Sequence, residues 1–227
     1  RYDVLLRVRD SQARELNVER MFAVAKAEGL QAAVDRWVIE HILAVLRRRI
    51  AAGSATVFFI KLSADTLGDS ETGQWIAQRI VEAQIDTRQL VFEFAETDVA
   101  AAVLSADRLL ASLHGLGCGI ALEHFGSLPG TARVLGRIPV DYVKIDATLL
   151  SRQEERHRIH ALLERCPGVS AVTLRRDLWR REMTVRPPGN LPRWVEVEAQ
   201  GRARRAIAFT VKPESPNYAG RLSLGEV

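Results

Sequence analysis

One short strand places a lysine between apolar residues and ends on a carboxylate. Val140-Asp141-Tyr142 leads into Val143-Lys144-Ile145, and Asp146 follows at once. The apolar residues indicate a buried strand. A lysine inside such a strand is costly unless an anion or a carboxylate lies beside it. We therefore predict that an acidic group from another part of the fold faces Lys144.

Three earlier apolar runs also end on polar residues. These runs and their polar ends are Val57–Ile60 with Lys61 and Ser63, Leu90–Phe94 with Glu96, and Cys118–Leu122 with Glu123 and His124. A parallel α/β barrel gathers such groups on one face, where the carboxyl ends of its strands meet. The pattern therefore predicts a polar site at that face.

The first 150 residues alternate strand patterns with helical ones. Helices are expected over residues 16–28, 31–50, 71–84, 99–116, 131–136 and 149–165. In the second of these, Val34, Val38, Ile42 and Val45 lie at core spacing. Alternation of this kind predicts a parallel sheet with right-handed crossovers.

The pattern changes after Cys166-Pro167-Gly168. Strands are expected over residues 169–174, 194–199, 206–211 and 221–224, with turns and no helix between them, which is an antiparallel pattern. We predict two units, residues 1–167 and a mostly β unit or tail over residues 168–227. The second holds 11 Lys and Arg against 6 Asp and Glu. Its arginines lack the interleaved aromatic residues of a nucleic-acid platform, so a solvated basic face is the preferred interpretation.

The composition is that of a water-soluble globular chain. Of the 227 residues, 47% are hydrophobic and 26% are charged, and neither a membrane-length apolar run nor a signal-peptide pattern is present. Two cysteines are too few for a disulfide framework, which fits the cytoplasm. The chain begins on a strand without Met, so we expect a piece of a longer protein.

Five motifs in order resemble those of EAL domains, the cyclic di-GMP phosphodiesterase family. Across residues 2–150 they are Tyr2-Asp3-Val4-Leu5-Leu6-Arg7, Ile60-Lys61-Leu62-Ser63, Glu93-Phe94-Ala95-Glu96, Leu122-Glu123-His124-Phe125-Gly126 and Val140–Asp146. The resemblance implies a modified TIM-like barrel of class α/β, incomplete in this chain. It also implies ligand contacts from Leu5, Arg7 and Asp146.

Active members of that family hydrolyse cyclic di-GMP with two Mg²⁺ or Mn²⁺ ions. Hard cations prefer carboxylate and amide oxygens, and two of them can clamp a phosphodiester. The resemblance would place Asp3, Lys61, Glu93, Glu123 and His124 at the metal positions, with Lys144 beside the attacking water.

Several of these positions depart from the family pattern. Asp3 replaces a glutamate and reaches about 1.5 Å less far. Lys61 replaces an asparagine and offers a cation no acceptor. Glu123 and His124 replace two aspartates, and two later acidic and amide elements of the family have no counterpart. We therefore expect no catalytic residues and no resident Mg²⁺ or Mn²⁺.

Two interpretations of the altered metal positions stay open. Glu93, Glu123 and His124 could hold one Zn²⁺ or Mn²⁺ ion, because imidazole suits these metals better than Mg²⁺. Alternatively, the Lys61 ammonium occupies the metal position and pairs with Glu93 or Asp3 as a structural salt bridge. The second interpretation is the simpler.

The resemblance favours a catalytically inactive receptor, similar to the LapD-type cyclic di-GMP receptors within the family. A ligand-free interaction module is the alternative, and an active phosphodiesterase is a third. The expected partners are cyclic di-GMP, a protein of a signalling pathway and a second copy of the chain, with no nucleic acid polymer. The expected location is cytoplasmic, with the parent protein anchored to the inner membrane.

Overall fold

A computed structural model describes most of the first 164 residues and parts of the remainder. The described residues are 2–9, 15–53, 56–128, 131–146, 149, 153–164, 170–174, 197–199, 202–213 and 222–225. The predicted strand over 194–199 and the turns of the tail fall largely outside them.

Strands and helices alternate along the described chain, as the sequence predicts. The strands are β1 (Tyr2–Arg9), β2 (Glu15–Leu16), β3 (Phe58–Lys61), β4 (Leu90–Ala95), β5 (Gly119–Glu123), β6 (Tyr142–Asp146), β7 (Ser170–Leu174), β8 (Val197–Ala199), β9 (Arg202–Pro213) and β10 (Leu222–Gly225). The helices are α1 (Val18–Ala27), α2 (Gln31–Ala51), α3 (Ala64–Gly68), α4 (Ser70–Ala83), η1 (Thr87–Gln89), α5 (Glu96–Ala101), α6 (Val103–Gly115), α7 (Thr131–Leu135) and α9 (Gln153–Glu164).

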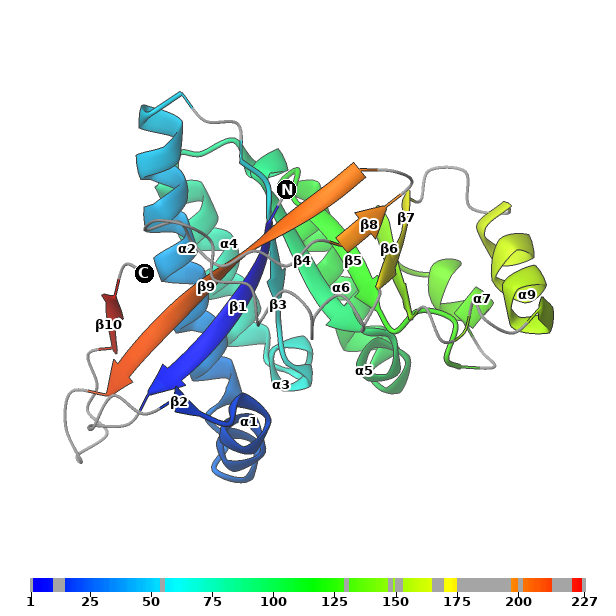
Figure 1. Ribbon diagram of the computed structural model, residues 1–227, viewed down its shortest axis with the longest axis horizontal. Coiled ribbons are helices and arrows are strands. Elements are labelled where there is room, and N and C mark those ends of the chain that lie inside the picture. The colour runs from blue at the N-terminus through cyan, green and yellow to red at the C-terminus, as the bar shows by residue number, and fades with distance from the viewer. Residues whose placement is uncertain are drawn as a thin grey trace.

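One sheet connects these strands in the order β10-β9-β1-β3-β4-β5-β6-β7. The pairs from β1 through β3, β4, β5 and β6 to β7 are all parallel. The predicted parallel α/β fold is therefore confirmed. The tail was predicted as antiparallel throughout, and this is wrong for two strands, because β7 pairs in parallel with β6 and β9 pairs in parallel with β1. Figure 1 shows the orange β9 beside the blue β1.

The two faces of the sheet bury different residues. One face packs on the helices through a large apolar cluster that includes Phe58, Phe92 and Ile120 from the strands. The other face carries a small cluster of Phe59, Val91 and Ala121. Since strand side chains alternate, neighbours in sequence such as Phe58 and Phe59 lie on opposite faces. This second face positions the candidate site.

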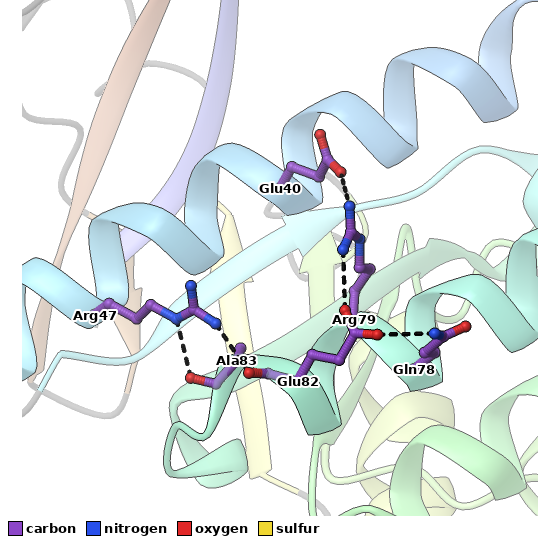
Figure 2. Close-up of polar contacts among 6 residues, drawn as sticks. All are labelled: Glu40, Arg47, Gln78, Arg79, Glu82 and Ala83. Carbon is purple, nitrogen blue, oxygen red and sulfur yellow. Dashed lines mark hydrogen bonds and ion pairs between the residues drawn. The ribbon is translucent and has the colours of Figure 1, made fainter.

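Helices α2 and α4 pack side by side over the first face, and arginines tie their outer surfaces together. Figure 2 shows Arg47 of α2 donating to the carbonyl oxygens of Glu82 and Ala83, both at 3.0 Å, at the end of α4. In the same view Arg79 of α4 pairs with Glu40 of α2 at 2.9 Å. Because Arg47 satisfies carbonyl groups that a helix end leaves free, it fixes the carboxyl end of α4.

Two helix predictions differ from the structure. The predicted helix over 99–116 is two helices, α5 and α6, which Ala102 separates with φ −125° and ψ 38°. In α2 the buried stripe is Asp35, Ile39, Ile42 and Leu46, while Val34, Val38 and Val45 are only partly buried. Both sets of residues have helical spacing. A pattern of apolar residues does not reveal the buried set, because that set begins with Asp35.

No helix among the described residues has both the length and the apolar character that a membrane crossing requires. The division into units 1–167 and 168–227 stays a prediction.

Candidate functional site

The face of the sheet that carries Phe59, Val91 and Ala121, here called the inner face, consists of an apolar layer below a charged layer. Phe59, Val91, Ala121 and Tyr142 form the apolar layer, with the rings of Phe59 and Tyr142 edge to face at 5.2 Å. Two residues further along the same strands stand Lys61, Glu93, Glu123 and Lys144. Because side chains repeat every second residue, each charged group faces the same side as its apolar predecessor. The predicted polar face is therefore a layer of lysines and glutamates.

Lys144 lies at the centre of the charged layer and contacts two carboxylates. Its side chain is 3% exposed, and its Nζ donates to Asp3 Oδ1 at 2.7 Å and pairs with Glu93. The ring of Phe59 lies 5.2 Å from the same nitrogen. This arrangement confirms the prediction that an acidic group faces Lys144.

The pKa values of this group follow from burial and pairing. Burial opposes the charge on Lys144, but the carboxylates of Glu93 and Asp3 outweigh it and raise the lysine pKa. Burial also raises the pKa of Glu93 to about 8, although the neighbouring ammonium of Lys144 opposes this shift. Three carboxylates of the layer (Asp3, Glu93 and Glu123) face two ammonium groups, so Glu93 shares the ammonium of Lys144 with Asp3.

Lys61 pairs with Glu123, at 2.5 Å between Nζ and Oε2. The prediction that Lys61 pairs with Glu93 or Asp3 is therefore wrong, because Lys144 occupies both of those carboxylates. Burial tends to raise the pKa of Glu123, but the charges of Lys61 and Lys144 prevail and the pKa is lowered. The Lys61 side chain is 55% exposed and that of Glu123 is 13% exposed, so this pair lies at the solvent side of the layer.

The loop after β5 is held from both sides. His124 adopts φ 53°, in the left-handed region that is uncommon for residues other than Gly but enriched in Asn, Asp and His. The N–H of Gly126 donates to Glu96 Oε2 at 2.9 Å, and the carbonyl of Gly126 accepts from Arg158 of α9. Glu96 is fully buried, so the second glutamate of the Glu93–Glu96 motif positions this loop.

Leu5 and Arg7 lie on the same face of β1 as Asp3. Tyr2 and Val4 pack against the helix-side cluster, whereas Asp3 contacts Lys144 on the opposite face. The alternation of the strand places Leu5 and then Arg7 above Asp3, with Arg7 about 13 Å further along. The side chain of Asp146, the third expected ligand contact, lies outside the described residues.

Asp35 of α2 is a buried acid, 4% exposed, that was not among the predicted site residues. Its Oδ2 accepts from Ser63 N at 2.8 Å, Ser63 Oγ at 2.6 Å and Thr66 Oγ1 at 2.7 Å. Burial raises its pKa, although these hydrogen bonds oppose the shift. Asp35 thus holds the segment that follows Lys61, and the signal for it was an acid at helical spacing from Ile39 and Ile42.

The sequence profile of the EAL domain family matches residues 1–166. The chain belongs to the EAL domain family. The five motifs that suggested this family lie within the matched residues. The charged layer consists of five of their side chains, Asp3, Lys61, Glu93, Glu123 and Lys144.

Curated relatives of this EAL domain are longer proteins. Cyclic di-GMP phosphodiesterase PdeF of Escherichia coli strain K12 is 30% identical over 149 residues, which cover 66% of this chain and 20% of the relative. Cyclic di-GMP phosphodiesterase PdeB of Shewanella oneidensis is 27% identical over 172 residues, covering 76% and 20%. The chain therefore spans about a fifth of the length of these relatives.

Solved EAL domains share the fold. The FimX EAL domain from Pseudomonas aeruginosa, bound to c-di-GMP, has a TM-score of 0.63 and 25% identity, covering 71% of this chain and 67% of that one. The LapD S helix-GGDEF-EAL structure from Vibrio cholerae, also bound to c-di-GMP, has a TM-score of 0.64 at 12% identity, covering 72% and 41%. At 12% identity the second likeness concerns the fold alone. Together with the family match, these structures establish the TIM-like architecture.

Proposed function

We propose that this EAL domain binds cyclic di-GMP without hydrolysing it and acts as a receptor in bacterial second-messenger signalling. The observation that carries the proposal is the pairing of both lysines of the charged layer. Lys61 contacts Glu123, and Lys144 contacts Asp3 and Glu93. Each carboxylate that the resemblance assigns to a metal ion therefore already has an ammonium group beside it.

A two-metal centre does not fit this donor set. An ammonium has no acceptor for a cation, and at roughly 4 Å it repels a divalent ion by several kcal/mol even at an effective dielectric constant near 20. No group of three His, Cys, Asp or Glu side chains within the described part of the chain has the geometry of a metal site. In this proposal no step depends on a metal ion, and the Lys61 ammonium beside Glu123 takes the structural role of a cation.

The binding role rests on groups above the charged layer. Arg7 is 26% exposed and lies on the face of Asp3, so a ligand at the mouth of the barrel can reach it. A guanidinium donates in pairs to phosphate oxygens or to a guanine edge, which suits a cyclic dinucleotide. FimX and LapD, two EAL proteins with the same fold, have been solved with c-di-GMP bound.

A second candidate is a ligand-free interaction module. The observation in its favour is that Arg7 already has an anionic neighbour, Glu15, at 3.3 Å from its Nε.

Calorimetric titration of cyclic di-GMP, in Mg²⁺ and again in EDTA, separates these functions. The receptor predicts a saturable site in both buffers and no linear product, with at least tenfold weaker binding by Arg7→Ala. Arg20→Ala, which removes an exposed arginine of α1, is the matched control and should bind like the parent. Formation of linear product in the presence of Mg²⁺ or Mn²⁺ would contradict the receptor proposal. The absence of binding heat in both buffers would favour the interaction module.

A further inference from the structure

Arg7, near the carboxyl end of β1, has a carboxylate for a neighbour. Its Nε lies 3.3 Å from Glu15 Oε1, and the two side chains are 26% and 52% exposed. No aligned hydrogen bond accompanies this contact among the described residues, so charge attraction alone holds it. Such a pair is weak and can be displaced by a better anion.

The backbone explains why this carboxylate is here. The two-residue strand β2 pairs with β1 in the antiparallel sense, with Arg9 opposite Glu15 and Val8 opposite Leu16. Residues directly opposite in such a pair face the same side of the sheet, and a strand repeats its facing every second residue. Glu15 therefore shares the face of Arg7 and lies diagonally across from it. The pairing of β2 with β1 keeps the acid near the arginine.

We propose that Glu15 is an affinity-determining residue, a resident counter-ion of Arg7 that an anionic ligand must displace. The inference rests on the proposed binding role of Arg7 and deepens it, because it names the group that sets how strongly the mouth attracts a phosphate. While Arg7 is paired with Glu15, its attraction for an incoming phosphate is reduced. The negative charge of Glu15 also repels the phosphate. Both effects weaken binding.

The test compares cyclic di-GMP titrations of the parent chain with Glu15→Gln, in EDTA at low salt. Glutamine keeps the size of the side chain and removes its charge. We expect Glu15→Gln to bind about threefold more tightly or better, the range of an exposed ion pair. Glu19→Gln removes an exposed carboxylate four residues away on α1 and should stay within about twofold of the parent.

A double-mutant cycle identifies Arg7 as the partner. Glu15→Gln should have a smaller effect in an Arg7→Ala background, because only the direct repulsion between Glu15 and the phosphate is left to remove there. Equal or weaker binding by Glu15→Gln beside a binding parent overturns the counter-ion role and leaves the receptor intact. The absence of binding in every variant overturns both proposals. Binding by Glu15→Gln alone would support the counter-ion role most strongly.

Discussion

At the scale of single residues, two lysines and three carboxylates define the candidate site. Lys144 is buried between Asp3 and Glu93, while Lys61 covers Glu123 at the solvent side. Three carboxylates and two lysines leave one negative charge without a cation. Glu93 carries this imbalance because it is buried, and its pKa is raised to about 8.

The raised pKa of Glu93 makes the stability of the domain depend on pH. A group with a pKa of 4.5 when unfolded and about 8 when folded stabilises the fold fully below pH 4.5. This contribution is lost as the pH rises toward 8, by up to about 1.4 kcal/mol per pH unit. We expect chemical denaturation between pH 5 and pH 8.5 to show falling stability, and a flatter profile for Glu93→Gln.

The control for this experiment is Glu154→Gln, which changes an exposed glutamate of α9 and should keep the slope of the parent. A parent chain whose stability does not change over this pH range would contradict the raised pKa of Glu93.

Replacing Lys61 by asparagine should open the charged layer to a metal ion. Lys61→Asn removes the ammonium from Glu123 and supplies an amide oxygen, so Mn²⁺ should raise the melting temperature of the variant by several degrees. The parent and Lys26→Asn, which alters an exposed lysine of α1, should show no such shift. Equal stabilisation of the parent by Mn²⁺ would mean that Lys61 does not block a metal.

At the scale of elements, the strands of the parallel sheet were predictable and two helices were misread. Each strand alternates between a helix-facing and an inward-facing set, and this period of two is visible in Phe58-Phe59-Ile60-Lys61. The buried stripe of α2 was hidden because its first member is Asp35. The partner of Lys61 was not predictable either, because the strand register places Lys61 beside Glu93. Lys144 occupies that carboxylate, and Lys61 pairs with Glu123 instead.

Asp35 should stabilise the junction between β3 and α3. Asp35→Ala leaves the Ser63 N–H, the Ser63 hydroxyl and the Thr66 hydroxyl without their acceptor. We expect a loss of about 3 kcal/mol in the free energy of unfolding, measured by denaturant titration. Asp65→Ala, a change two residues beyond Ser63, serves as the control, and a similar small loss for both variants would argue against the anchor.

At the scale of the whole molecule, strand β9 of the tail pairs in parallel with β1 of the barrel sheet. The sequence of the tail predicts antiparallel strands, and β9 does pair with β8 and β10 in the antiparallel sense. Its parallel pairing with β1 was not readable, because the partners Tyr2 and Arg205 are some 200 residues apart and no local pattern specifies such a contact.

The pairing of β9 with β1 predicts that the family-matched segment depends on the tail. A chain ending at residue 166 loses the strand whose register runs from Tyr2↔Arg205 to Val8↔Val211. We expect the backbone amides of residues 3–8 to exchange with deuterium faster in the shorter chain, because their side of the sheet becomes an edge. Unchanged protection in the shorter chain would show that β9 does not shield β1.

The apolar layer beneath the charges has a consequence for ionic strength. Phe59 and Tyr142 pack below the buried Lys144, whereas Lys61 is exposed, so dissolved ions reach the Lys61–Glu123 pair more readily than Lys144. Counter-ions screen exposed pairs far more than buried ones. Added salt should therefore loosen Lys61 from Glu123 while Lys144 keeps both of its carboxylates, so that the two lysines respond differently to the same solution.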